Sequence, residues 1–449
     1  MNALPIIPIP HPLSARVRVP GSKSLTNRAL LLAALAEGTT TLTNALNSDD
    51  SRYFMESLAR LGFALVQPAV SNSQSQITIT GLGGLLPSPQ SELFVGNAGT
   101  AARFLTALLT LGHGDYTLDG DARMRERPIG DLLDALTQLG ANVQSVNRPI
   151  THSSRSIPLG PNHLCPPVHV LASGLPGGRA TIAGDTSSQF LSALLMVAPY
   201  ARSPVELVVV HGLNSRPFVD LTLGVMADFG VTVERDGYDH FSITPQRYRS
   251  PGTYAIESDA SAASYFFAAP AICGGTVRVL NASLRSSQGD IAFLGVLADM
   301  GCAVTEGDHW IEVEARPESP LRGVDVDLRD LPDTAQTLAA LAPFAVSPTT
   351  IRGIASARVK ETDRVAATCA ELRRLGVTVE EYPDGLKIYP CQNIQPATIH
   401  TYNDHRMAMA FALIGLRVPG VVIENPGCVS KTFPRYFEVI ESLRDRTIG

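Results

Sequence analysis

The feature that most constrains this 449-residue chain is an internal repeat that occurs six times. Each copy opens with a few small polar residues and continues as an almost uninterrupted apolar run. The six copies open at Gly21, Gly96, Gly184, Ser258, Leu331 and Tyr402. The spacing is about 75 residues, which is typical of a supersecondary unit used repeatedly.

A second signal recurs later in five of the copies. A helix-like segment ends in a glycine and is followed by a short apolar segment, at Gly62, Gly140, Gly230, Gly301 and Gly376. Glycine just past a helix is the usual left-handed stop. Between the two helices, β-branched runs such as residues 38–46 and 203–213 predict strands. The copies are therefore β-α-β modules, and two sets of three predict two similar α/β domains.

Composition excludes several other classes of protein. Hydrophobic residues make up 45% and charged residues 17%, which is typical of a globular chain. The net charge of -6 provides no overall positive field for nucleic acid or lipid. The apolar runs are shorter than the roughly 20 residues that cross a bilayer, and the N-terminus lacks the basic region of a signal peptide. We expect a cytoplasmic protein with no membrane or nucleic-acid partner.

Cysteine and lysine usage adds two expectations. The six cysteines lie far apart with no C-x-x-C pair, so we expect reduced thiols and neither disulfides nor a zinc site. Lysine occurs only at Lys23, Lys360, Lys387 and Lys431, which leaves 36 minus 4, or 32, arginines. A lysine differs from arginine in its compact charge and its readily shifted pKa. Lys387 lies in a turn-like segment and is expected on a solvated face, whereas the other three lie in polar, motif-like loops.

The first helix of each module is predicted to be buried because it is apolar on nearly every face. Its N-terminus carries unsatisfied N–H groups and a partial positive charge. Ordinary capping by small polar residues explains any single one of these ends. However, Lys23, Arg28, Arg103 and Arg406 lie at three of the six ends, where cations are costly unless an anion binds there. We therefore predict a local anion site.

Three loops that lead into the second helices carry the same chemistry. Residues 123–128 contain three arginines, residues 358–364 mix three cations with two carboxylates, and residues 430–434 supply Lys431. A solvated charged face is the usual reading of such runs, but their recurrence at one place in the repeat favours binding. Micromolar binding of a phosphate ligand needs about 8 kcal/mol, and a charge-assisted hydrogen bond contributes about 1.5–3 kcal/mol. Four or five such contacts are sufficient.

Six motifs, taken together, resemble those of the 5-enolpyruvylshikimate-3-phosphate synthase family of enolpyruvyl transferases. They occupy residues 20–24, 96–100, 123–129, 359–364, 402–408 and 431–434. The likeness runs from about residue 10 to residue 440 in the family's order. It implies two domains of three modules around buried parallel helices, described as an inside-out α/β barrel. It also implies a monomer with its active site in the cleft between the domains.

The resemblance sets the domain boundaries because the chain crosses between the domains twice. One domain is expected at residues 21–256, and the other at residues 1–20 joined with 257–449. The sixth module lacks a helix-Gly-strand signal of its own. We expect its last helix, near Tyr436 to Asp445, to be completed by an N-terminal strand at Ala15 to Val19.

The implied reaction joins shikimate 3-phosphate and phosphoenolpyruvate and releases phosphate. By resemblance, Asp333 takes the hydroxyl proton, Glu361 donates a proton to the methylene carbon, and Lys23 shares in the proton transfers. Shikimate 3-phosphate is expected at Lys23, Ser24, Arg28, Ser187, Ser188, Gln189, Ser215, Asp333, Ser356 and Lys360. Phosphoenolpyruvate is expected at Lys23, Asn97, Gly99, Arg127, Gln189, Arg364, Arg406 and Lys431. No metal or organic cofactor is implied.

Several positions depart from the family's usual pattern. Ser356 stands where asparagine is common and reaches less far toward a ligand. Phe218 replaces a tyrosine and removes one hydroxyl. Ala102 and Phe104 replace methionine and proline on the second buried helix. We expect Phe104 to shift Gly99 and Thr100 slightly, so the response to phosphonate analogues of phosphoenolpyruvate does not follow from the sequence. Arginines replace two lysines, at Arg125 and Arg216.

Two alternatives remain at this point. The sister enolpyruvyl transferase that acts on UDP-N-acetylglucosamine shares the fold, but it generally carries a loop cysteine where this chain has residues 121–125. A non-catalytic anion-binding protein would use the same cations and would need neither Asp333 nor Glu361.

Overall fold

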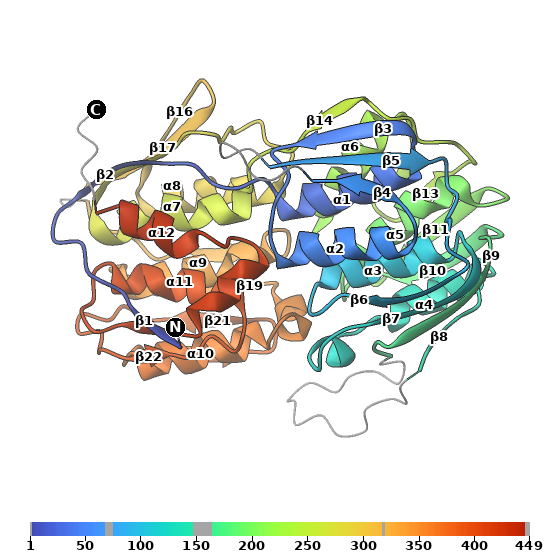
Figure 1. The fold of residues 1–449 in the computed structure, drawn as a ribbon. Coiled ribbons are helices and arrows are strands. Elements are labelled where there is room, and N and C mark those ends of the chain that lie inside the picture. Colours follow the sequence, from blue (N-terminus) through green and yellow to red (C-terminus); the bar gives the residue numbers. More distant parts are fainter. Residues whose placement is uncertain (1, 68–74, 147–163, 317–318, 445–449) are drawn as a thin grey trace. The chain divides into compact units, whose positions relative to one another are not determined.

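The computed structural model describes residues 2–67, 75–146, 164–316 and 319–444. The chain forms two compact units (Figure 1). The middle unit is Gly21–Glu257, and the terminal unit combines Met1–Pro20 with Ser258–Gly449. The chain therefore leaves the terminal unit after Pro20 and returns to it at Ser258.

The middle unit repeats one module three times, with two helices and a four-stranded sheet in each copy. The helices are α1 (Lys23–Leu35), α2 (Asp49–Arg60), α3 (Gly99–Leu109), α4 (Gly130–Gln138), α5 (Ser188–Val197) and α6 (Arg216–Asp228). The first sheet has the order β14 (Thr253–Ala255), β3 (Glu37–Thr43), β5 (Gln76–Leu82) and β4 (Ala64–Val66). The second has the order β6 (Gln90–Phe94), β7 (His113–Asp119), β9 (Val168–Ser173) and β8 (Val143–Ser145). The third has the order β10 (Gly178–Ala183), β11 (Val205–Val210), β13 (His240–Ile243) and β12 (Glu234–Asp236).

The terminal unit repeats the same plan. Its helices are α7 (Ala260–Cys273), α8 (Phe293–Met300), α9 (Ala335–Leu341), α10 (Arg364–Arg374), α11 (His405–Gly415) and α12 (Tyr436–Ser442). One sheet has the order β16 (Ala303–Gly307), β17 (Trp310–Ala315), β15 (Gly275–Val279) and β2 (Leu13–Val17). The next has the order β18 (Asp325–Asp327), β19 (Thr349–Arg352), β21 (Gly385–Ile388) and β20 (Val379–Tyr382). The last has the order β1 (Ala3–Pro5), β23 (Val422–Glu424) and β22 (Thr398–Ile399).

The mixed α/β class is confirmed, and each module is larger than the predicted β-α-β unit. In the four-stranded sheets one parallel pair is extended by two antiparallel strands, as in β10-β11-β13-β12. Within the described residues there are six small sheets, and none of them closes into a barrel. The expected helix stops are confirmed: Gly62, Gly140, Gly230, Gly301 and Gly376 all have φ between 79° and 109°.

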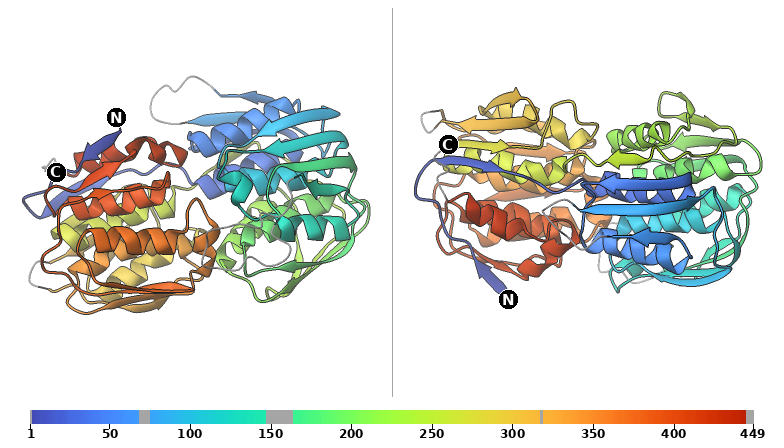
Figure 2. Two further views of the ribbon diagram at one scale, coloured as in Figure 1. Left: turned by 90° about the horizontal axis from the view of Figure 1, so that it is seen from below. Right: turned by 45° about the horizontal axis from the view of Figure 1, so that its top comes forward.

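The six apolar runs form the buried helices of the two units. Every residue of α3, α9 and α11 is buried, as the lack of a polar face predicts. In the terminal unit, α7, α9 and α11 pack against one another. Two further views show the helices and sheets of this unit from other sides (Figure 2). This packing brings the N-terminal ends of these helices within reach of the loops that carry charge.

The N-terminal strands differ from the expectation. Residues 15–19 do not complete the sixth module, because β2 pairs in parallel with β15 in the fourth. The sixth module is completed by β1, which pairs antiparallel with β23. The expected end of the last helix at Asp445 lies outside the described residues. The apolar run around Ala15 predicts a strand but not its partner.

At each crossing between the units, a strand pairs with a partner that is distant in sequence. The strand β14 precedes α7 in sequence but pairs in parallel with β3, at the start of the middle unit. Likewise β2 precedes α1 but pairs with β15. At both crossings, therefore, the chain passes to the other unit between a strand and the helix that follows it.

Two further observations concern the chain as a whole. In the parts of the chain that the structure describes, no helix has the length and apolar character needed to span a membrane. All six cysteines are free. Burial raises the pKa of the Cys369 and Cys428 thiols to about 12, so these two are uncharged at neutral pH.

Candidate active site

In the terminal unit, Arg364 connects three carboxylates. It opens α10, where the Asp363 side chain caps the helix by accepting from the Ala366 N–H. The Arg364 side chain is only 2% exposed. It donates to both oxygens of Asp404 (2.7 and 3.1 Å), to Glu361 Oε2 (2.8 Å) and to Asp333 Oδ1 (3.2 Å). Burial alone lowers its pKa, but these carboxylates outweigh burial, and the pKa of Arg364 lies above its usual value.

Arg406 approaches Asp333 from a different helix. Its Nη2 donates to Asp333 Oδ2 (2.7 Å) and its Nη1 to the Asp333 carbonyl (3.1 Å). Asp404 caps α11 by accepting from the Arg406 N–H (2.9 Å). The pKa of Arg406 is raised well above its usual value because Asp333 and other negative groups outweigh the effect of burial. Asp333 is thus held by two guanidinium groups, and its side chain stays 15% exposed.

Two neighbouring loops, which end at Lys431 and follow the turn Ala355–Val359, place two lysines and the second predicted catalytic carboxylate. Lys431 Nζ lies 3.8 Å from Glu361 Oε1, and both residues are buried. Ser356 lies in the short turn Ala355–Val359, and Lys360 directly follows this turn. In this turn Arg358 points into the protein, where it bonds Asp363, Glu381 and the carbonyls of the β20–β21 hairpin. Arg358 therefore stabilises the segment that carries Lys360 and Glu361.

In the middle unit, four of the expected phosphoenolpyruvate residues meet at the start of α3. Ala98, the N-cap residue of this helix, makes no side-chain capping bond. Arg127 Nη1 donates to the carbonyl and the side-chain oxygen of Asn97 (both 3.0 Å). A Cβ at Gly99 would lie 2.4 Å from Arg127 Nη2, so only glycine admits the guanidinium this close. Gln189 donates to Thr100 Oγ1 (3.3 Å), which joins the start of α5 to the same place.

Arg28 is a buried cation in the middle unit, and no carboxylate of the described residues pairs with it. It donates to Thr222 Oγ1 (2.8 Å), the Phe218 carbonyl (2.9 Å), the Ser24 carbonyl (3.0 Å) and Ser192 Oγ (3.4 Å). Burial lowers the pKa of Arg28 to about 9. A buried charge held only by neutral oxygens is costly, so this site favours an external anion.

The other expected residues of this unit lie at helix starts. Ser187 caps α5 by accepting from the Gln189 N–H, and Ser188 is its first residue. Ser215 precedes α6 with a left-handed φ of 57°. Lys23, the first residue of α1, has its Nζ 3.9 Å from Asp50 Oδ2. Within each unit, then, the predicted residues gather at the N-terminal ends of the helices.

Sequence reasoning missed Asp404 and the bracing role of Arg358. Asp404 directly precedes the apolar run of α11, so its position as a helix cap was a usable signal. Its second contact, with Arg364, joins residues 40 positions apart and has no local signal.

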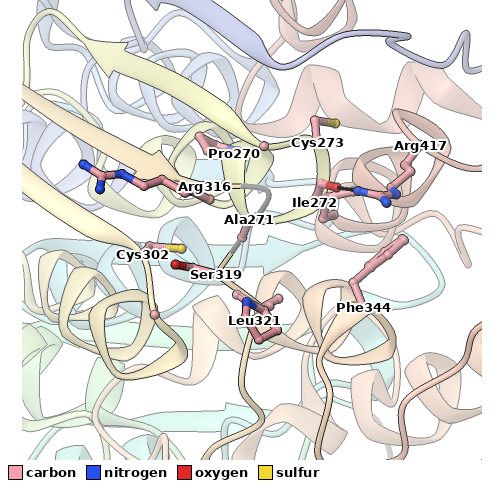
Figure 3. Close-up of a pocket in the computed structure, with 14 residues that line it drawn as sticks. Pro270, Ala271, Ile272, Cys273, Cys302, Arg316, Ser319, Leu321, Phe344 and Arg417 are labelled. Carbon is pink, nitrogen blue, oxygen red and sulfur yellow. Dashed lines mark hydrogen bonds between the residues drawn. The ribbon is translucent and has the colours of Figure 1, made fainter.

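A cavity of about 210 Å³ lies in the terminal unit, at the other end of α7 (Figure 3). Cys273, Cys302, Ser319, Phe344 and Arg417 are among the residues that line it. The 14 residues of α7 span about 20 Å, so this cavity is well separated from the helix start near Asp259. None of the predicted site residues lines it.

Known proteins resemble this chain over almost its whole length. A profile of EPSP synthase (3-phosphoshikimate 1-carboxyvinyltransferase) matches residues 7–440. The chain belongs to the EPSP synthase family. A curated 3-phosphoshikimate 1-carboxyvinyltransferase of Nostoc punctiforme is 49% identical over 438 residues, which cover 97% of this chain and 98% of that protein. One from Shewanella baltica is 50% identical over 430 residues, with 95% and 96% covered.

Solved structures support the fold of the EPSP synthase family. The structure of EPSP synthase from Acinetobacter baumannii superposes with a TM-score of 0.78 at 24% identity, covering 99% of this chain and 98% of that one. The family matched is that of the 3-phosphoshikimate enzymes, which favours this assignment over the UDP-N-acetylglucosamine alternative.

The departures from the usual EPSP synthase pattern have local consequences. The guanidinium of Arg28 lies over the Phe104 ring, 5.4 Å from its centroid, so Phe104 supports Arg28 through a cation–π contact. Phe218 lacks a hydroxyl, but its carbonyl accepts from Arg28. Ser356 is 8% exposed, so little of its surface is open to solvent.

Proposed function

We propose that this member of the EPSP synthase family transfers the enolpyruvyl group of phosphoenolpyruvate to the 5-hydroxyl of shikimate 3-phosphate. Phosphate is released, and the product leads toward chorismate and the aromatic amino acids. The full-length family match supports this reaction. The structural observation that carries it is that one buried guanidinium, Arg364, holds both Asp333 and Glu361. A base and an acid are thereby kept close together, as addition followed by elimination requires.

The proposed chemistry has two stages. First, Asp333 takes the proton of the 5-hydroxyl of shikimate 3-phosphate, and the hydroxyl oxygen attacks the enol carbon of phosphoenolpyruvate. Glu361 protonates the methylene carbon, which gives a tetrahedral adduct. Next, the Glu361 carboxylate takes a proton back from the new methyl group while the carbon–oxygen bond to phosphate breaks. The bonding pair leaves with phosphate, which forms the enolpyruvyl ether. Lys23 and Lys431 would balance the negative charge on phosphate as it leaves.

The binding roles draw on residues of both units. Arg364 and Arg406 would hold the carboxylate of phosphoenolpyruvate, and its phosphate would bind Arg127, Gly99 and Lys431. Arg28, Ser187, Ser188, Ser215 and Lys360 would hold shikimate 3-phosphate. We propose that both groups of residues act on one pair of substrates, as membership of the EPSP synthase family implies.

The direct test is phosphate release by the purified protein from shikimate 3-phosphate and phosphoenolpyruvate, with each substrate omitted in turn. Release that needs both is the expected result. Binding of both without any release would support a non-catalytic anion-binding protein instead.

Arg28→Met tests the buried cation. We expect KM for shikimate 3-phosphate to rise about 10- to 100-fold, because a charge-assisted bond of about 1.5–3 kcal/mol is lost. The free energy of unfolding should change by no more than about 2 kcal/mol, since the removed charge has no carboxylate partner. Steady-state kinetics and urea unfolding measure both quantities. Arg179→Met, on the exposed part of β10, is the control. An unchanged KM would contradict the assignment.

A further inference from the structure

We propose that Asp290 is a positioning residue which shares the charge of Arg406 with Asp333 and so sets how strongly Asp333 attracts a proton. The inference rests on the function proposed above, in which Asp333 is the base. Asp290 belongs to none of the motifs that carry the family resemblance, and it lies on a short turn of a different module, Gly289–Ala292.

Asp290 is buried beside the start of α7, and one of its carboxylate oxygens accepts no hydrogen bond from the described residues. The residue is 4% exposed. Ser261 Oγ donates to its Oδ2, and its Oδ1 has no hydrogen-bond partner in the described part of the chain. A buried carboxylate oxygen without a donor is costly, so its position calls for an explanation.

Capping of α7 does not explain Asp290. The side chain of Asp259 already accepts from the Ala262 N–H (2.8 Å). Gln288 Oε1 accepts from the Ala260 N–H (3.1 Å). The helix start is therefore satisfied by two other side chains, and Asp290 bonds only the Ser261 hydroxyl.

The charged groups around Asp290 come from three elements. They are Asp333 on the turn that begins α9, Arg406 on α11 and Asp259 at the start of α7. The turns that carry Asp290 and Asp333 both pack against α7, and α11 packs against it as well. Burial and then the charge of Asp333 raise the pKa of Asp290 to about 7, while Ser261 and Arg406 oppose the rise.

Arg406 therefore interacts electrostatically with two carboxyl groups: Asp333, to which it is hydrogen-bonded, and the buried Asp290. When Asp290 is ionised, part of the positive field of Arg406 is neutralised, so Asp333 binds a proton more strongly and an external anion is held less tightly. When Asp290 is neutral, Arg406 acts fully on Asp333 and on the anion. Asp290 thus balances the strength of the base against affinity for phosphoenolpyruvate.

The test is Asp290→Asn in the full chain, with Asp299→Asn as the control for the same change of charge on an exposed face of α8. For Asp290→Asn we expect kcat to fall about tenfold and KM for phosphoenolpyruvate to fall as well. The acidic limb of the pH profile of kcat should move to lower pH, because a weaker base loses its proton at lower pH. The control should leave all three unchanged.

A purely structural role would give a different pattern. Higher KM for both substrates, with an unmoved acidic limb, would overturn the inference. If Asp290→Asn does not fold, Ser261→Ala serves in its place, because loss of the hydroxyl donor should move the ionisation of Asp290 to higher pH. An unchanged pH profile in that variant would also overturn the inference.

Infrared spectroscopy separates failure of this inference from failure of the proposed reaction. Between pH 5 and 9 the wild type should lose one buried protonated-carboxyl band, with a midpoint near pH 7. The band should be absent from Asp290→Asn and present in Asp299→Asn. This readout needs no turnover, so it stands even if no phosphate is released. A missing band in the wild type counts against Asp290.

Discussion

Replacing Asp333 by asparagine is expected to lower kcat by about 10²- to 10⁴-fold, the range typical for loss of a general base. Asparagine keeps one oxygen that can accept from either Arg406 or Arg364, turns an NH2 toward the other, and cannot take the hydroxyl proton. Phosphate release from the two substrates measures the effect, and urea unfolding checks that the variant is folded.

The control for this variant is Asp325→Asn on β18. Asp325 is an exposed carboxylate that pairs with the exposed Arg352, and such pairs contribute little to stability. We expect its kcat to match the wild type. If Asp333→Asn turned over at the wild-type rate, the role of Asp333 as the base would be wrong, and the anion-binding alternative would gain support.

Replacing Asp404 by alanine is expected to destabilise the terminal unit by about 3–5 kcal/mol, as when one partner of a buried ion pair is removed. Asp404 is fully buried, bonds two nitrogens of Arg364 and caps α11. Activity should fall with stability, because Arg364 would lose the partner that orients it toward Asp333 and Glu361. Urea unfolding followed by hydrogen exchange would assign the loss to this unit.

Glu438→Ala is a suitable comparison on α12. Its ion pair with Arg435 is exposed, and its removal should cost less than about 1 kcal/mol. Should Asp404→Ala cost no more than this variant, Asp404 would not be the main support of Arg364.

The sequence predicted the features that depend on neighbouring residues. The buried helices follow from apolar runs without a polar face, and the helix ends follow from glycines such as Gly62 and Gly376. The charged run of residues 358–364 predicted that cations and carboxylates gather in this loop, and the ion pair of Arg364 with Glu361 lies there. Each of these signals lies within a single module.

The remainder depends on which modules meet in space. The run around Ala15 predicts a strand equally well beside the fourth or the sixth module, and only three-dimensional packing selects β15 as its partner. The link between Asp404 and Arg364 joins two modules, and so does the approach of Asp290 to Arg406. No local pattern reports such pairings.

The exchange of β2 and β14 constrains the order in which a nascent chain can fold. When the middle unit leaves the ribosome it can complete its first sheet only after β14 has been made, about 210 residues after β3. The terminal strand β2 must wait longer, because β15 is synthesised after the whole middle unit. During translation the completed middle unit is therefore preceded by β2, which has no partner strand yet. An unpaired strand of this kind can associate with other chains.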